Sequence, residues 1–243
     1  MNESKKIKRI LEIIPGALSW LIILVLICLS MFKPVACAVI IIVFDFYWII
    51  RTGYLTTLLL LAHRRLLKDK NKNWLKACER LASKYDWKGL HHLVIFPVYK
   101  EGIDILRASL EALRACHYPK DKMIVVMAFE ARYKSSRETA KILEGEFGRE
   151  FGGYLTTFHP DGLSGEKRLK GSNATWAAKR AKDYLEGKSI PLGRVIVSCF
   201  DADTCVDKEY FGCLTYHFIT NPKSHQASYQ PVPVYNNNIW YAP

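Results

Sequence analysis

Two long apolar runs near the beginning of the chain constrain its fold more than any other feature. They cover residues 16–32 and 35–50 and are separated only by Lys33 and Pro34, and apolar character continues through residues 54–62. About 20 apolar helical residues cover a hydrocarbon core of roughly 30 Å, so each run is long enough to cross a bilayer. A cleaved secretory signal would contain a single short apolar core. We therefore expect a transmembrane hairpin of two retained helices with a tight turn at Lys33-Pro34.

Positive charge flanks the hairpin on both far sides. Four basic residues lie within positions 5–9, and a second basic stretch covers residues 63–76. Lysine and arginine are enriched on the cytoplasmic side of membrane spans. The pattern predicts a multi-pass protein of the cell membrane whose two ends and globular domain are cytoplasmic. The alternative is a buried helical hairpin in a soluble protein, although runs this long and uncharged are rare in soluble cores.

Charge and cysteine content exclude other classes of protein. The formal net charge is +12, but the basic residues cluster at the membrane flanks and in a few polar stretches. Basic segments beside an anionic cytoplasmic leaflet need no nucleic acid to explain them, so we expect a lipid bilayer as partner and no nucleic acid. The seven cysteines include no Cys-x-x-Cys pair. An odd number without that spacing argues against a disulfide framework or a zinc site and indicates reduced thiols.

From residue 90 onward, short apolar runs alternate with amphipathic stretches, as in alternating strands and helices. The sequence thus divides into a hairpin (1–62), a basic, partly helical connector (63–89) and an α/β domain (90–243). The expected strands cover residues 93–96, 123–129, 154–158 and 194–200, and the expected helices cover 103–116, 135–147, 172–185 and 208–219. This succession predicts a Rossmann-type parallel sheet with helices on both faces. Such sheets bind ligands at the carboxyl ends of their strands.

Two aspartates, Asp201 and Asp203, follow the fourth expected strand. Residues i and i+2 share a face of a strand, so two carboxylates placed in this way repel each other unless a cation or a shared proton lies between them. Hard oxygen ligands suit Mg²⁺ or Mn²⁺, which commonly bridge to phosphate. The alternative is a turn followed by a helix cap, because Asp and Thr are good capping residues and a helix is expected from Lys208.

The loops after the first two strands carry further candidates. Tyr99 offers a flat face for a base, Pro97 bends the chain, and Glu101 can accept hydrogen bonds from ribose or base. Glu130 ends the second strand, where it can accept from a base N–H, and Arg132 follows it. The alternatives are an ordinary loop for the first group and a surface ion pair for the second.

A basic turn precedes the third expected helix. Gly171 is surrounded by four polar residues: Lys167, Arg168, Lys170 and Asn173. The N–H groups at a helix N-terminus favour anions, and the lysines and arginine add charge, so a pyrophosphate would be stabilised here. The alternative is a solvated basic turn.

Taken in order, these segments resemble a membrane-anchored glycosyltransferase of family 2, similar to cellulose synthase and hyaluronan synthase relatives. The resemblance covers residues 90–235, and the ordered set carries it rather than any single motif. The segments are Pro97-Val-Tyr-Lys-Glu101, Glu130, Lys170-Gly-Ser-Asn173 and Asp201-Ala-Asp203. Lys100 stands where the family has Asn, and Glu130 stands where it usually has Asp. The family's fold is the nucleotide-sugar transferase fold called GT-A.

The resemblance implies a role for each segment. Pro97, Tyr99 and Glu101 would hold the nucleoside, and Glu130 would read the base. Lys170 and Asn173 would belong to the same donor site, and Asp201 and Asp203 would hold Mg²⁺ or Mn²⁺ together with the sugar diphosphate. The implied activity is inverting transfer of a sugar from a nucleotide-diphosphate donor to a glycan or lipid acceptor. Uridine is the commonest nucleoside in such donors, and guanosine remains open. Gln230-Pro-Val-Pro resembles a strand that helps to form the acceptor region.

No residue is a candidate for the general base that an inverting transfer requires. The last carboxylates are Asp207 and Glu209, and residues 210–243 contain none. The Gln-x-x-Arg-Trp pattern of processive relatives is also missing. We therefore expect the chain to be the donor-binding half of a longer enzyme, which binds nucleotide without turning it over.

Two alternatives come from other functional classes. Asp201-Ala-Asp-Thr204 also resembles the nucleophile loop of haloacid-dehalogenase-like phosphatases, in which Asp201 would attack phosphate and Asp203 would act as acid and base. That family needs a lysine and a second acidic pair after this loop, and residues 210–243 offer no acidic pair. The other alternative is a non-catalytic membrane module that binds a nucleotide or a partner chain.

Overall fold

The structure is a computed structural model that describes residues 3–133, 135–163, 165–166 and 169–232. The chain forms two compact units, residues 1–69 and 70–243, which are described separately. The boundary between the units lies a few residues beyond the predicted end of the hairpin at residue 62.

The N-terminal unit consists of two helices, α1 (Glu3–Phe32) and α2 (Pro34–Lys70). The helical path is interrupted only at Lys33, and Pro34 takes the first position of α2, where its missing N–H costs nothing. Both helices are long and apolar enough to cross a membrane. Among their described residues, only Cys37 is buried. The two expected apolar helices and the break between them at Lys33-Pro34 are thus confirmed.

α2 does not end where the apolar run ends. It continues through the basic residues 63–70, which the sequence assigned to a partly helical connector. No glycine or proline occurs between Tyr54 and Lys70, so nothing in this stretch stops the helix. The connector resumes with the short helix α3 (Trp74–Arg80), whose N-cap Asn73 accepts from the N–H of Lys76 at 2.8 Å.

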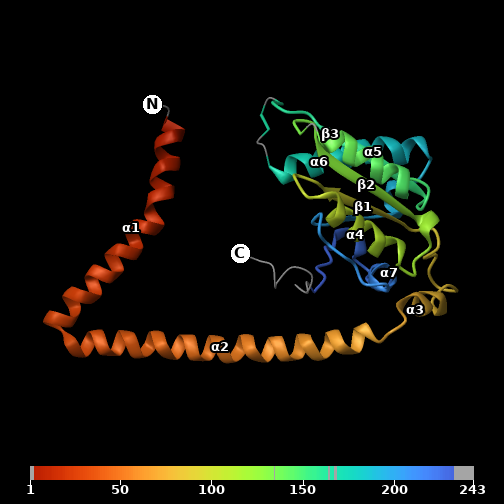
Figure 1. Ribbon diagram of the computed structural model, residues 1–243. Helices are drawn as coiled ribbons and strands as arrows, with labels where there is room; N and C mark the ends of the chain where they lie inside the picture. Colours follow the sequence, from red (N-terminus) through yellow and green to blue (C-terminus); the bar gives the residue numbers. More distant parts are fainter. Residues whose placement is uncertain (1–2, 134, 164, 167–168, 233–243) are drawn as a thin grey trace. The chain divides into compact units, whose positions relative to one another are not determined.

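Four parallel strands form the sheet of the second unit: β1 (His91–Pro97), β2 (Met123–Glu130), β3 (Gly153–His159) and β4 (Val195–Cys199). Their order is β3-β2-β1-β4, and every neighbouring pair is parallel. Figure 1 labels the first three, with β2 between β3 and β1. All eight residues of β2 are buried, which explains the continuous apolar run in the sequence. The predicted parallel sheet is confirmed.

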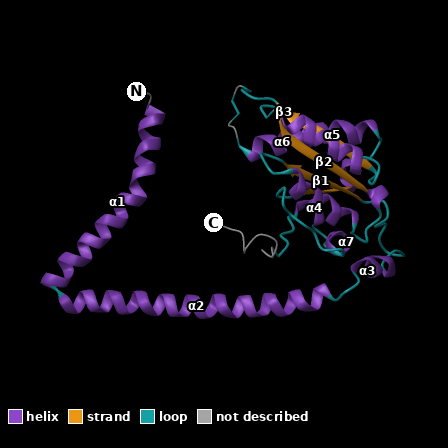
Figure 2. Cartoon of the chain, viewed as in Figure 1, coloured by secondary structure: helices purple, strands orange, loops and turns teal. Residues whose placement is uncertain are grey.

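Helices pack on both faces of the sheet, as predicted. Figure 2 shows them in purple around the orange strands. One face is covered by α4 (Ile103–Arg114), α5 (Ser135–Phe147) and α7 (Tyr210–Thr220). The other face is covered by α6 (Lys170–Gly187), which lays Ala177, Ala181 and Leu185 against β1 and β2. Three short 3₁₀ turns, residues 120–122, 192–194 and 224–226, complete the described elements.

Two expected boundaries are wrong in ways that matter for the site. α6 begins at Lys170, two residues earlier than expected. β4 ends at Cys199, so the aspartates at 201 and 203 lie in a turn rather than on a strand face. The N–H of Thr204 donates to the carbonyl of Asp201 at 2.9 Å and closes that turn. The strand expected at Gln230-Pro-Val-Pro is also not found at residues 230–232, which belong to no strand. Pro233 lies outside the described residues.

Candidate ligand-binding site

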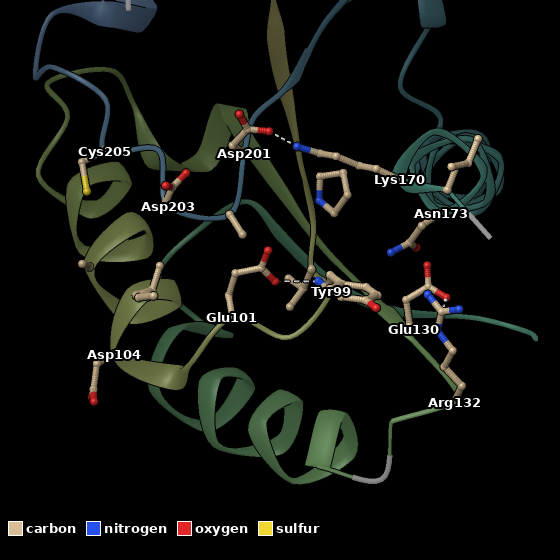
Figure 3. A pocket seen from close by; sticks show the side chains of 16 residues that line it. Tyr99, Glu101, Asp104, Glu130, Arg132, Lys170, Asn173, Asp201, Asp203 and Cys205 are labelled. Carbon is tan, nitrogen blue, oxygen red and sulfur yellow. Dashed lines mark hydrogen bonds and ion pairs between the residues drawn. The ribbon is translucent and has the colours of Figure 1, made fainter. Parts of the chain in front are cut away.

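One cavity of about 1020 Å³ opens at the carboxyl ends of β1, β2 and β4. Ligand pockets in proteins commonly hold about 300–1,000 Å³, so the cavity is large enough for a nucleotide-sized molecule. All eight side chains that the sequence singled out for the site line it, namely Pro97, Tyr99, Glu101, Glu130, Lys170, Asn173, Asp201 and Asp203 (Figure 3). The structure therefore brings together residues from four separate segments. Lys167 and Arg168 lie outside the described residues.

The loop after β1 is held in shape by one of its own predicted ligand-binding residues. Oε2 of Glu101 accepts from the backbone N–H of Tyr99 at 2.6 Å and of Lys100 at 3.0 Å. The N–H of Val98 donates to the carbonyl of Ala128 at 2.8 Å, which continues the β1–β2 ladder into the loop. Glu101 thus has a structural role that the sequence did not indicate.

An aromatic pair surrounded by cations lies at this loop. The rings of Tyr99 and Tyr133 are 5.2 Å apart and nearly perpendicular, at 89°. The side chains of Lys100 and Arg132 lie 5.4 and 5.3 Å from the ring of Tyr99. The hydrogen bond with Tyr133, followed by the Lys100 charge, lowers the pKa of the Tyr99 phenol below its usual value. Half of the Tyr99 surface is exposed (51%), so its ring remains accessible for stacking.

Glu130, the last residue of β2, is buried in the cavity wall with only 6% of its surface exposed. Its Oε2 lies 3.6 Å from Nε of Arg132 and 3.6 Å from Nδ1 of His159. The ion pair with Arg132 that the sequence left open is therefore present, but it is buried rather than at the surface. Buried carboxylates need such partners because desolvation penalises their charge.

His159 and Glu166 lie behind the cavity wall, beside Glu130, and the sequence analysis missed them. His159 ends β3, and its Nε2 lies 2.9 Å from Oε2 of Glu166. In the β2–β3 pairing His159 is directly opposite Glu130. The rule that directs attention to the carboxyl ends of parallel strands applies to the third strand as well, so a titratable residue ending it was a usable signal.

The first turn of α6 supplies a buried amide. Asn173 is 1% exposed, and its Nδ2 donates to the carbonyl of Ala128 in β2 at 2.7 Å. This bond fixes the orientation of the amide, and Oδ1 is left buried without a hydrogen-bond partner in the described part of the chain. Because unsatisfied buried acceptors are costly, Oδ1 is suited to accept from a ligand donor in the cavity.

Lys170 begins α6 and forms an ion pair with Oδ1 of Asp201 (Figure 3). Both side chains are more than half exposed. The pair joins the helix N-terminus to the turn after β4, so cationic and anionic groups meet at one end of the cavity. Lys170, the described basic residue of this segment, is therefore not simply solvated, since it contacts Asp201.

The turn at Asp201–Thr204, not strand alternation, places both aspartates at the cavity. Its centre is anchored by Oγ of Ser109 in α4, which donates to the carbonyl of Ala202 at 2.7 Å in a buried bond. The alternative of a turn followed by a helix cap is thus met in its first part, the turn. Its second part is wrong, because the N-cap position of α7 is Glu209, which makes no side-chain capping bond.

The two aspartates fit a cation only in part. Their carboxylate oxygens are the ligand type that Mg²⁺ and Mn²⁺ prefer. Nowhere in residues 3–133, 135–163, 165–166 and 169–232 do three or more His, Cys, Asp or Glu side chains gather as a metal cluster. An ion at this turn would therefore complete its coordination with water or with phosphate oxygens, as Mg²⁺ usually does.

Replacing Ser109 with alanine is expected to lower the free energy of unfolding of the α/β unit by about 1–3 kcal/mol, because the buried carbonyl of Ala202 loses its partner. Ser109→Cys, which keeps a weak donor, should cost less. Urea unfolding followed by circular dichroism measures the difference. A Ser109→Ala protein with unchanged stability would show that water replaces the bond, and the anchor would then be unimportant.

The comparisons with known proteins do not extend this description. No protein-family model and no curated protein matches the chain.

Proposed function

We propose that the chain binds a nucleotide-diphosphate sugar in the cavity, with Mg²⁺ or Mn²⁺, as the donor-binding part of a membrane-bound family 2 glycosyltransferase with a GT-A-type fold. One observation carries the proposal: eight residues chosen by chemistry from four distant segments line a single cavity at the carboxyl ends of parallel strands. Nucleotide ligands commonly occupy that edge in α/β sheets.

The arrangement of the side chains divides the cavity into a base end and a phosphate end. The ring of Tyr99, the carboxylate of Glu130 and Oδ1 of Asn173 supply a stacking face and acceptors for a base or ribose. Lys170 and the N-terminus of α6 supply positive charge for a diphosphate. Asp201 and Asp203 would supply carboxylate oxygens to a divalent cation.

The ion pair between Lys170 and Asp201 gives the phosphate end a built-in exchange. Asp201 would hold a divalent cation together with Asp203, and Lys170, released from its ion pair with Asp201, would then be available to phosphate oxygens. When bound, the cation would supply charge neutralisation for the diphosphate. The chain's own contribution is to hold the diphosphate between α6 and the aspartate turn.

We assign no general base. Glu101 holds its own loop, and Glu130 is buried beside Arg132 and His159. Asp104 lines the cavity but pairs with Arg107 at 2.9 Å. We therefore expect nucleotide binding without sugar transfer by the purified chain.

The two apolar helices fit the same proposal. α1 and α2 would cross the bilayer of the cell membrane twice, with the basic segments at both ends on the cytoplasmic side. The α/β unit would then face the cytoplasm, where nucleotide sugars are available. A glycan or lipid would be the acceptor.

Nucleotide binding tests the proposal directly. Isothermal titration of the full chain in detergent with uridine or guanosine diphosphate should detect binding that is stronger with Mn²⁺ than with a chelator. Asp203→Ala should weaken the Mn²⁺-dependent affinity by about ten- to hundredfold, the effect of losing one charged contact. Asp104→Ala is the matched control, because Asp104 also lines the cavity but is 91% exposed and paired within α4.

The outcomes separate the competing functions. Absence of binding to either nucleotide would refute the proposal, and affinity that is unchanged in Asp203→Ala would favour a membrane scaffold. Trapping of a phosphoaspartate at Asp201 would instead favour the phosphatase alternative. Sugar transfer by the purified chain would contradict the expectation that no base is present.

A further inference from the structure

The base end of the cavity holds three polar side chains whose hydrogen-bonding groups are largely unused. They line the cavity together with the ring of Tyr99 and are Glu130, Arg132 and Asn173 (Figure 3). Glu130 is 6% exposed, Asn173 is 1% exposed, and the side chain of Arg132 is 18% exposed. Buried polar groups in folded proteins nearly always have hydrogen-bond partners. A cluster that lacks them in the cavity wall therefore indicates which groups a ligand should carry.

Two of the three side chains present acceptors. Nδ2 of Asn173 donates to the carbonyl of Ala128, so Oδ1 is the atom left without a partner among the described residues. Glu130 follows Ala128 by two residues in β2, and the two side chains share the face of the sheet that α6 covers. The nitrogens of Arg132 and His159 lie 3.6 Å from Oε2 of Glu130, which is beyond hydrogen-bond distance. Neighbouring acceptors on Asn173 and Glu130 thus remain open to a ligand.

Arg132 supplies the donors of this cluster. Its Nε is buried and donates to no described residue. The guanidinium lies 5.3 Å from the ring centroid of Tyr99 and 5.1 Å from that of Tyr133, so the two rings hold it in place. A guanidinium carries five N–H donors and no acceptor. Its free partner must therefore be an acceptor on the ligand.

Nucleobases differ in how they match this set of groups. The hydrogen-bonding edge of guanine carries two neighbouring donors, N1–H and N2–H, and beside them the acceptor O6. Uracil carries one donor, N3–H, between two carbonyl oxygens. Adenine and cytosine each carry one amino group beside an acceptor ring nitrogen. Guanine is therefore the base that places two donors side by side next to an acceptor.

We propose that the cavity selects guanine, with the Glu130 carboxylate and Oδ1 of Asn173 accepting from N1–H and N2–H, and with Arg132 donating to O6. This inference rests on the proposed nucleotide function and names the donor as a guanosine diphosphate sugar. The resemblance described above left uridine and guanosine open, and the hydrogen-bonding groups of the base end favour guanosine. A uracil in the same place would turn a carbonyl oxygen towards one of the acceptors and leave that acceptor unpaired, which costs affinity.

The test is isothermal titration of the full chain in detergent, with Mn²⁺, against five nucleoside diphosphates: guanosine, inosine, uridine, cytidine and adenosine diphosphate. All five share the ribose and the diphosphate, so differences in affinity report the base. Inosine diphosphate differs from guanosine diphosphate only in lacking the N2 amino group. It therefore measures the contribution of one donor without any change in the protein.

Guanosine diphosphate should bind about ten- to hundredfold more tightly than uridine, cytidine or adenosine diphosphate, the effect of one or two hydrogen bonds to a charged or buried acceptor. Inosine diphosphate should bind about tenfold more weakly than guanosine diphosphate, because it lacks one of the two donors.

Glu130→Gln replaces one acceptor oxygen with an amino donor at nearly the same volume. Affinity for guanosine diphosphate should fall about tenfold or more, and affinity for uridine diphosphate should rise, because a donor now meets a uracil carbonyl. Asp104→Asn is the matched control. It removes the same charge from another carboxylate that lines the cavity, but Asp104 is 91% exposed and paired with Arg107, so the wild-type preference should persist.

Three results would overturn the inference. If wild type binds uridine, cytidine, adenosine or inosine diphosphate as tightly as guanosine diphosphate, the acceptors do not select guanine, and the proposed function stands without this selectivity. An equal change in affinity for guanosine and uridine diphosphate in Glu130→Gln would show that Glu130 does not read the base. If wild type binds none of the five, the proposed function fails and the inference fails with it. The comparison of inosine with guanosine diphosphate decides the matter even if Glu130→Gln does not fold.

Discussion

Replacing Phe211 with alanine is expected to lower the free energy of unfolding of the α/β unit by about 3–5 kcal/mol, the range for a fully buried phenylalanine. Phe211 lies in the first turn of α7 and is completely buried. Its ring is 4.9 Å from the ring of His92 and 6.4 Å from that of Tyr118. It also meets Phe200, the residue before the aspartate turn, at 6.5 Å. The cavity left by truncation would therefore loosen α7, β1 and the base of the candidate site together.

The neighbouring His92 increases the expected loss of stability on truncation of Phe211. Burial lowers the pKa of His92 to about 3, so its ring is neutral in the core. Its Nε2 lies 2.8 Å from Oγ1 of Thr215, one turn after Phe211 on α7. Water entering the space left by the phenyl ring would compete for this buried polar pair, which raises the cost of the substitution.

Thermal and urea unfolding of the full chain in detergent, followed by near-ultraviolet circular dichroism, measures the Phe211→Ala effect. Phe218→Ala on the same helix is the control, because Phe218 is only partly buried. The control should lose clearly less stability. Equal losses in the two variants would mean that the ring cluster around His92 does not dominate the packing of α7.

Glu209→Ala is expected to cost roughly 2–3 kcal/mol, since it removes charged hydrogen bonds and leaves backbone donors unpaired. Oε2 of Glu209 accepts from the N–H groups of Trp74 and Leu75 at 2.8 and 3.1 Å. Oε1 lies 2.6 Å from Nδ1 of His117. One side chain thus joins the start of α3 to the start of α7, and its loss should release α3.

The same contact should be acid-sensitive. Burial acts to raise the pKa of Glu209, but the hydrogen bonds from His117, Leu75 and Trp74 outweigh it, and the pKa is lowered below its ordinary 4.5. A carboxyl whose pKa is lowered in the folded state stabilises that state above its unfolded pKa. This stabilisation is lost as pH falls through the lowered value. The docking of α3 is therefore expected to persist at neutral pH and to weaken below about pH 4.5.

Hydrogen exchange of the peptide covering residues 70–80 reports both effects. Protection should fall in Glu209→Ala at neutral pH and in the wild type under acid. Glu79→Ala, an exposed change within α3, is the matched control and should leave protection unchanged. Full protection of this peptide in Glu209→Ala would show that the packing of Trp74, and not the carboxylate, holds α3.

The order of strands and helices was predictable because each element carries a local signal. The expected helix at 135–147 matches α5, and the expected strand at 123–129 lacks only Glu130 of β2. The boundaries that failed depend on contacts between distant residues. β4 stops at Cys199 because the next residues form a turn anchored by Ser109. A sequence read along one strand gives no sign of such an anchor.

The residues that line the cavity could be predicted from the sequence, but the contacts that each of them makes could not. Residues at the carboxyl ends of parallel strands must meet, so chemistry and topology together selected the lining of the cavity. The partner of each side chain depends on three-dimensional distances that no spacing in the sequence gives. Lys170 contacts Asp201, Glu101 binds its own loop, and Glu166 reaches back to His159.

The closed loop after β1 has a thermodynamic consequence. Glu101 holds the backbone of Tyr99 and Lys100 through hydrogen bonds within the protein itself, so this segment is ordered before a ligand binds there. The conformational entropy of this segment is lost on folding, so binding of a ligand does not have to order the segment again. Substituting Glu101 should consequently act on the entropy of association as well as on any direct contact, which is the signature of a preorganised receptor.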